Sequence, residues 1–343
     1  MKQNSSYKLS FVILFILLVF TFFLNLSLGS VSIPLSEIFE SLFGSNTTNQ
    51  SWNYIVVNFR LPKAFTAILA GTGLSLSGLL MQTLFRNPLA GPFVLGISSG
   101  ASLGVAILIL GASILGGSFI LLGQSNLAIA IAASLGSFLV LTAVMLVAYK
   151  VKNTMAILII GLMFGSFTAA IISVLSYFSS AENLQQYLFW SFGSLGNLSW
   201  NELLVFFLIF LFGIVLIVPN IKSLNSLLLG ENYAKSLGLN LNRTRNLILI
   251  ATSILTGVIT AFSGPIAFIG LAVPHITKLI FNTSNHKILI PAVAMFGAIF
   301  MLLADTIAQL PTSEFVLPIN AITSMFGAPV VIWLLIRKKK LSL

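Results

Sequence analysis

The amino-acid sequence predicts an all-α integral membrane protein with about ten transmembrane helices. Of its 343 residues, 57% are hydrophobic and only 7% are charged, whereas roughly a quarter of the residues in an ordinary soluble domain are charged. A helix that crosses the hydrocarbon core of a bilayer needs about 20 apolar residues. Apolar runs of about that length recur along the chain, so we expect one transmembrane domain over residues 1–343.

Polar residues, prolines and glycines divide the chain into these apolar stretches. The first stretch follows Lys2 and Lys8 as a signal peptide would, but it runs to about Gly29 without a small-x-small cleavage site. We therefore expect it to remain as the first helix. The expected spans are residues 11–29, 64–84, 93–116, 127–149, 155–178, 203–219, 246–263, 265–281, 288–308 and 316–336.

The basic residues orient these spans. If the N-terminus is cytoplasmic, fifteen of the 17 Lys and Arg residues lie inside, and only Arg60 and Lys63 lie outside. Lys and Arg concentrate in cytoplasmic loops, so we expect both termini in the cytoplasm. The net charge of +10 does not predict nucleic-acid binding, because the basic residues lie between apolar runs instead of on one soluble face.

Two connections are longer than simple turns. The outer segment, about residues 30–59, is expected to form a short interfacial helix and a loop. The inner segment, about residues 219–245, mixes leucines with polar residues and predicts amphipathic helices. Such helices lie either on the lipid headgroups or against a soluble partner.

Small residues crowd the second and third spans, in GTGLSLSG (residues 71–78) and GISSGASLG (residues 96–104). Small residues let helices approach closely in lipid, so packing is the expected role of most of these glycines. In RNPLAGP (residues 86–92) two prolines and a glycine predict a rigid turn. In residues 262–279, Gly264 with Pro265 is expected to end one span, and Pro274 to interrupt the next.

Few ionisable residues lie within the spans. Asp305 is the one carboxylate placed there, and it is either functional or a helix-end group that is hydrated or accepts hydrogen bonds. His275 is expected to be structural. No series of Asp, Glu or His crosses the spans, which weakens an ion-coupled carrier. The sequence has no cysteine, no Walker A motif and no HExxH motif. We therefore expect neither an enzyme nor a metal site, and energy for uphill transport must come from another chain.

Seven motifs together resemble the FecCD-type permeases of bacterial ABC importers for iron siderophores, haem and cobalamin. The resemblance covers nearly the whole chain. The matching stretches are RLPK (residues 60–63), SGLLMQTLFRNPLAGPFVLGISSGA (77–101), GSLGNLSW (193–200), LGENYAKSLGLN (229–240), GPIAFIGLAVPHITKL (264–279), LLADTIAQL (302–310) and GAPVVIWLL (327–335).

The resemblance implies the architecture of a type II ABC importer permease in the bacterial cytoplasmic (inner) membrane. It implies a second permease subunit, either the same chain or a homologue, a cytoplasmic ATPase dimer and an extracytoplasmic binding protein. ATP would be used by the ATPase, and this chain would bind no cofactor. A ferric siderophore is the first expected cargo, then haem, then cobalamin. The alternative is a carrier or channel for a small solute that works alone.

The resemblance also implies three functional sites. Arg60 and Lys63 would dock the binding protein, although the family often has a further arginine at the position of the neutral Gln309. The other two sets are longer. ATPase coupling would involve Leu229, Gly230, Glu231, Ala234, Leu237 and Gly238. The cytoplasmic gate would involve Asn87, Pro88, Leu89, Asn153 and Thr154.

Overall fold

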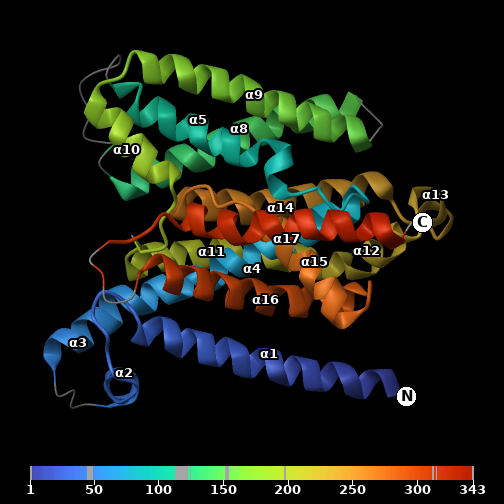
Figure 1. Cartoon of the computed structure of the whole chain (residues 1–343). Coiled ribbons are helices and arrows are strands. Elements are labelled where there is room, and N and C mark those ends of the chain that lie inside the picture. Colours follow the sequence, from blue (N-terminus) through green and yellow to red (C-terminus); the bar gives the residue numbers. More distant parts are fainter. Residues whose placement is uncertain are drawn as a thin grey trace. The chain divides into compact units, whose positions relative to one another are not determined.

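The computed structural model describes residues 2–44, 49–112, 123, 125–150, 154–196, 198–310, 313 and 315–341, and the secondary structure of these residues is helical (Figure 1). Helices satisfy every main-chain donor and acceptor within one segment, as a bilayer interior requires. Seven described segments are long and apolar enough to cross a membrane, and three shorter apolar helices accompany them. These ten coincide with the ten expected spans, so the predicted fold class is confirmed.

The helices at the ten expected spans are α1 (Lys2–Ser27), α4 (Leu61–Leu84), α5 (Ile97–Ile109), α8 (Asn126–Lys150), α9 (Thr154–Tyr177), α11 (Trp200–Ile217), α14 (Leu241–Ser263), α15 (Ile269–Phe281), α16 (His286–Ala308) and α17 (Ile319–Leu341). The shorter elements are α2 (Leu35–Phe43), α3 (Gln50–Ile55), the π-helix η1 (Val56–Arg60), the 3-10 helices η2 (Pro92–Leu95) and η3 (Val218–Asn220), α10 (Ala181–Ser191), α12 (Ile221–Leu228) and α13 (Glu231–Ser236).

Several helix ends differ from the expectation. The second span extends backwards through η1 and α3, so that Gln50–Leu84 is continuously helical. α14 begins at Leu241, about one turn early, because the Asn240 side chain accepts a hydrogen bond from the Arg243 N–H at 3.0 Å and caps the helix. α10 was not predicted, because its polar sequence does not resemble a span.

The expected interruption at Pro274 is wrong. Gly264 ends α14 with a φ of 72°, as expected, but α15 starts after Phe268 and continues through Pro274. Proline is tolerated in membrane helices where neighbouring groups replace the lost hydrogen bond. The break therefore lies before α15, where the Ala267 N–H donates to Asn320 Oδ1 of α17 at 3.1 Å.

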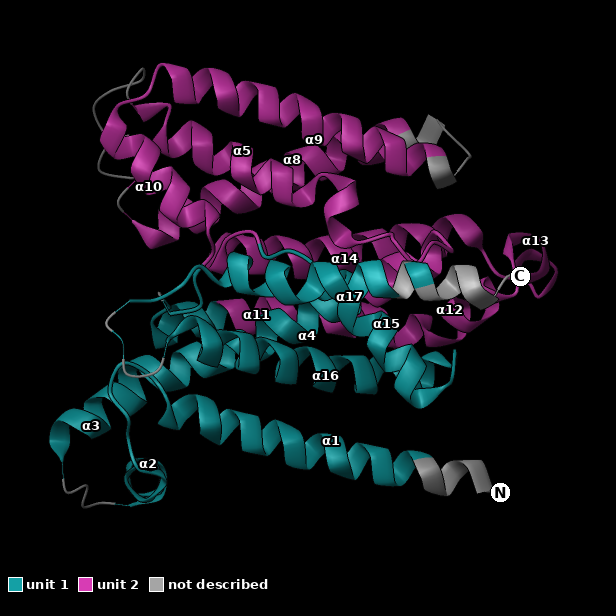
Figure 2. Cartoon of the chain, viewed as in Figure 1, with its two compact units in different colours: residues 1–76, 194–205, 266–343 teal, residues 77–193, 206–265 magenta. Residues whose placement is uncertain are grey.

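Two compact units make up the chain (Figure 2). Unit 1 comprises residues 1–76, 194–205 and 266–343, and in it α16 packs against α1, α15 and α17. Unit 2 comprises residues 77–193 and 206–265, and in it α5 and α14 pack against α8, with α9 beside α5.

Glycines make the closest helix crossings in both units. In unit 1, a Cβ atom added to Gly71 of α4 would overlap the main-chain oxygen of Gly297 of α16, and the reverse also holds. Thr72 Oγ1 donates to Ala294 O across the same crossing at 3.1 Å. In unit 2, Gly100 of α5 and Gly136 of α8 contact each other in the same way. The predicted packing role of the two glycine-rich motifs is confirmed.

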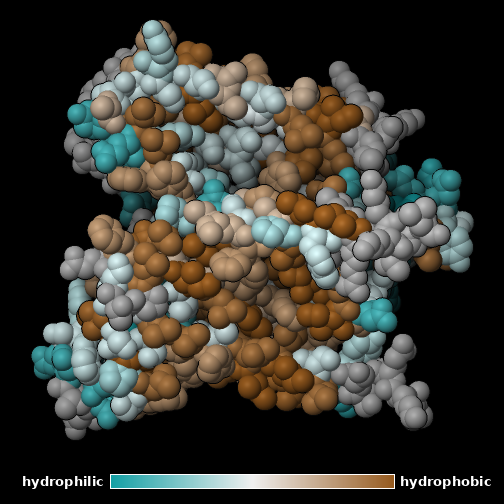
Figure 3. Space-filling view, in the orientation of Figure 1, coloured by the Kyte–Doolittle hydropathy of each residue, from teal (hydrophilic) through white to brown (hydrophobic). Residues whose placement is uncertain are grey.

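Apolar side chains cover the outside of the long helices (Figure 3). In α1, for example, Phe15, Ile16 and Phe20 are each about 60% exposed. Such a surface would be unstable in water and is suited to lipid or to another membrane subunit. The chain is therefore a multi-pass membrane protein.

A matched pair of glycine substitutions tests the α4–α16 crossing. Gly71→Ala places a methyl group against the main chain of Gly297, so we expect a loss of about 1–3 kcal/mol of stability from overpacking. Gly257→Ala is the control, because a Cβ atom there would meet only Ser137 at 3.8 Å. Thermal unfolding in detergent should show a lower Tm for Gly71→Ala alone. Equal Tm values for the two variants would contradict the crossing.

Candidate functional site

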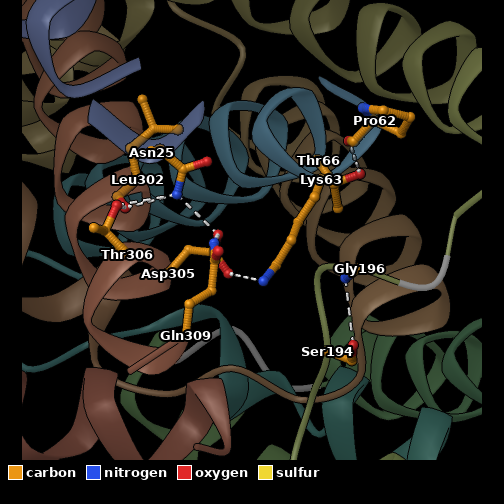
Figure 4. Close-up of polar contacts among 10 residues, drawn as sticks. All are labelled: Asn25, Pro62, Lys63, Thr66, Ser194, Gly196, Leu302, Asp305, Thr306 and Gln309. Atoms are coloured by element: carbon orange, nitrogen blue, oxygen red, sulfur yellow. Dashed lines mark hydrogen bonds and ion pairs between the residues drawn. The ribbon is translucent and has the colours of Figure 1, made fainter. Parts of the chain in front are cut away.

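A buried ion pair joins α4 to α16 (Figure 4). Lys63, in the first turn of α4, places its Nζ 3.1 Å from Oδ1 of Asp305, near the end of α16. The side chains are only 18% and 3% exposed, respectively. A buried carboxylate needs both a counter-charge and hydrogen bonds, and Lys63 supplies the counter-charge.

Two amides supply the hydrogen bonds that the Asp305 carboxylate still needs. Asn25 Nδ2 of α1 donates to Asp305 Oδ2 at 2.9 Å, and Gln309 Nε2 donates to the same oxygen at 2.7 Å. Asn25 also contacts Thr306 Oγ1 at 3.1 Å. The carboxylate therefore ties α1, α4 and the end of α16 together. Asp305 thus accepts hydrogen bonds at a helix end, as one of the two readings of this residue expects.

Arg60 holds the end of α1. Its guanidinium donates to the main-chain oxygens of Leu26, Ser27 and Val31, with a distance of 3.0 Å to Ser27 O. The residue is only 8% exposed. The last carbonyls of a helix lack partners within that helix, and Arg60 provides them. This contact could not be predicted from the sequence, because Arg60 and its acceptors are 29 to 34 residues apart.

The GSLGNLSW motif lies against Lys63. A Cβ atom at Gly196 would be 3.5 Å from Lys63 Cδ, an ordinary van der Waals distance, so Gly196 lies beside the lysine stem. Trp200 Nε1 donates to Val57 O at 3.0 Å. The motif therefore packs on the segment that carries Arg60 and Lys63.

A second group of residues surrounds α12 and α13 in unit 2. The expected amphipathic helices are present: Leu224, Leu227 and Ala234 are buried, whereas Leu229 and Leu237 are 62% and 58% exposed. Gly230, with a φ of 109°, separates the two helices, and Gly238, with a φ of 81°, follows α13. This segment thus presents apolar side chains that nothing in the described part of unit 2 covers.

A cavity of about 780 Å³ opens beside α13. Its lining residues are Leu84, Phe85, Arg86, Leu229, Gly230, Glu231, Asn232, Tyr233 and Ser236. A second cavity of about 940 Å³ shares Leu84 and Glu231 with the first and extends to Met145, Ile157 and Leu249. Of the predicted coupling residues, Leu229, Gly230 and Glu231 line the first cavity, and Gly238 lines the second. Arg86, which sequence reasoning did not single out, lines the first cavity with them.

The predicted gate residues at the end of α4 form a turn. Asn87 Oδ1 accepts from the Leu89 N–H at 2.9 Å, and Asn87 O accepts from the Ala90 N–H at 3.1 Å. Leu89 is 42% exposed. Thr154 begins α9, and Asn153 lies outside the described residues.

Metal-binding groups do not cluster in the part of the chain that the structure describes: no three His, Cys, Asp or Glu residues lie close enough there to hold an ion. The Asn25 and Gln309 amides and the Lys63–Asp305 ion pair join helices to one another. The exposed side chains of Leu229 and Leu237 are suited to contact with another protein.

Comparison with known proteins agrees with this architecture. The FecCD transport family model matches residues 17–337. The hemin transport system permease protein HmuU of Yersinia pestis is 35% identical over 317 residues, which cover 92% of this chain and 93% of HmuU. The vitamin B12 import system permease protein BtuC of Salmonella typhi is 37% identical over 289 residues, 83% of this chain and 84% of BtuC.

A solved structure is also similar. It is of a transporter described as an ABC transporter of the metal-chelate type, in an inward-facing conformation. The two chains superpose with a TM-score of 0.80 at 30% identity, over 93% of this chain and 97% of the solved one.

The fold and these similarities define a multi-pass α-helical subunit of a membrane transporter. The chain belongs to the FecCD transport family, and it is a permease subunit of an ABC importer.

Removal of one partner tests the buried ion pair. Asp305→Ala leaves Lys63 buried without a counter-charge, so we expect it to cost about 3–5 kcal/mol of stability. The double variant Lys63→Met/Asp305→Leu should recover most of that loss, since an apolar pair can replace a buried ion pair. Thermal unfolding in detergent measures both. The control is Glu40→Gln on exposed α2. An Asp305→Ala variant as stable as this control would contradict the analysis.

Proposed function

We propose that this permease carries a metal chelate into the cell, with a ferric siderophore as the first candidate and haem and cobalamin next. Similarity over nearly the full length to permeases named for hemin and vitamin B12 transport, and to a metal-chelate type transporter, supports this class of cargo. All three are ring or chelate complexes that hold their metal without help from the protein. The described residues contain no metal-binding cluster, which suits such a cargo because the permease needs to pass the chelate and not to hold the metal.

The transporter would contain three further kinds of subunit. These are a second permease, identical or homologous, a cytoplasmic ATPase dimer and an extracytoplasmic binding protein. The distribution of Lys and Arg supports an orientation with both termini in the cytoplasm. In that orientation α13 faces the ATPase, and the Lys63 end of α4 faces the binding protein.

The coupling site would consist of Leu229, Gly230, Glu231, Ala234, Leu237 and Gly238. Exposed Leu229 and Leu237 offer apolar contacts, while buried Ala234 holds α13 on unit 2. A short helix that follows ATPase closure can move the spans joined to it. Five residues would form the cytoplasmic gate: Asn87, Pro88 and Leu89 after α4, and Asn153 and Thr154 at the start of α9.

The docking site would use Lys63 directly and Arg60 indirectly. Lys63 keeps 18% of its side chain exposed, whereas Arg60 is occupied by carbonyl groups. Arg60 would thus fix the outer end of α1 and η1, and Lys63 would attract a carboxylate of the binding protein.

Transport by the reconstituted complex tests the cargo. The permease, its ATPase and its binding protein are placed in liposomes, and a ferric siderophore, haem and cobalamin are offered in turn. We expect ATP-dependent accumulation of one of the three and none without the ATPase. Accumulation without ATPase and binding protein would favour a carrier that works alone. Uptake of none of the three would contradict the proposed cargo class.

A pair of variants that both lack the Asp305 charge tests docking by Lys63. Asp305→Asn keeps the Lys63 charge, whereas Lys63→Gln/Asp305→Asn removes it. We expect the double variant to need about two- to fivefold more binding protein for half-maximal uptake than the single variant, as for a partly exposed ion pair. The difference should shrink at high salt. If the two variants need the same concentration of binding protein for half-maximal uptake, Lys63 has no role in docking.

A further inference from the structure

Arg86 occupies a special main-chain position. It follows Phe85 after the last residue of α4, and its φ is 48°, in the left-handed region that residues with a side chain rarely adopt. Its N–H donates to Thr83 O at 3.3 Å. The chain thus turns sharply at Arg86 and enters the turn of Asn87 and Leu89. This turn sets the direction of the Cα–Cβ bond of Arg86.

The guanidinium of Arg86 is exposed and has no hydrogen bond or ion pair with any part of the chain that the structure describes. Its Nη1 atom lies against Gly230, 3.6 Å from where a Cβ atom of that glycine would be. Both residues line the 780 Å³ cavity. Arg86 and α13 therefore face the same open space within unit 2.

The lining of this cavity suits an acidic group. Among the described lining residues Arg86 is the one cation, and Asn232 and Tyr233 have side chains that can donate hydrogen bonds. Glu231 is the one acid among these residues and already has an interaction with another group. A guanidinium offers two parallel N–H donors that match the two oxygens of a carboxylate.

We propose that this cavity receives an acidic side chain of the ATPase subunit, and that Arg86 binds its carboxylate. The proposal rests on the coupling function of α13. A lipid phosphate is the other common anion near a membrane. The ATPase is favoured because the cavity is continuous with the proposed coupling surface. Leu229 and Tyr233, which are 62% and 53% exposed, belong to the cavity lining and to the proposed coupling surface at once. A protein surface can cover these side chains while its carboxylate enters the cavity.

Arg86 would connect the ATPase to the gate turn through one peptide bond. The residue that binds the partner directly precedes Asn87, so movement of the bound carboxylate acts on the turn itself as well as on α13. Coupling would then use two contacts, one at Leu229 and Leu237 and the other at Arg86.

ATPase binding to the permease in nanodiscs of phosphatidylcholine tests the proposal. Arg86→Gln should weaken binding about tenfold, the range expected for a charge-assisted hydrogen bond, and should flatten its salt dependence. The affinity of Arg86→Lys for the ATPase should lie between those of Arg86→Gln and the parent, because lysine keeps the charge but not the paired donors. The control is Arg243→Gln, an exposed arginine that lines neither cavity, and it should bind as the parent does.

Leu237→Asp separates this proposal from the coupling function on which it rests. If Leu237→Asp abolishes binding while Arg86→Gln binds as the parent does, the carboxylate site is wrong and the coupling surface stands. If Leu237→Asp binds and transports normally, the coupling surface itself is wrong. An effect of Arg86→Gln that appears only when phosphatidylglycerol replaces phosphatidylcholine would assign Arg86 to a lipid phosphate and overturn the proposal.

Discussion

Every main-chain N–H and C=O group inside a bilayer must find its hydrogen-bond partner within the protein, because hydrocarbon offers none. Long helices meet this requirement except where they begin and end. In this chain, side chains from other segments take over at those points. Arg60 binds the carbonyls at the end of α1, and Asn320 of α17 accepts from Ala267 in the extended segment before α15. These polar side chains allow the helices to end without leaving main-chain groups unbonded.

The same requirement explains the cluster around Asp305. A carboxylate at this depth is costly unless it is paired and fully hydrogen-bonded. Lys63, Asn25 and Gln309 together satisfy it. The cluster therefore fixes α1, α4 and α16 to one another at the ends that the proposed binding protein would approach. Partial exposure of Lys63 leaves it able to serve both the cluster and a partner.

The remaining residues have two roles: glycines form close helix crossings, and exposed leucines form a surface that can contact a partner. Glycine pairs such as Gly71 with Gly297 bring main chains into contact, where van der Waals packing replaces the hydrophobic effect. Leu229 and Leu237, which flank α13, differ from the leucines of the spans because they lie in a short segment between polar residues. Their exposure next to Arg86 is what makes this segment a candidate contact surface for a soluble partner.

The sequence alone determined the ten spans, the packing role of the glycines and the family, because apolar length and small-residue patterns are local properties of the chain. It also located the amphipathic segment before α14. It did not reveal that Arg60 is occupied by α1 or that Asp305 is paired with Lys63, because these contacts join residues far apart in the sequence. The free guanidinium of Arg86 beside Gly230 was equally invisible, since more than a hundred residues separate them. Only the tertiary structure decides which of the few charges are neutralised inside a unit and which remain available to a partner.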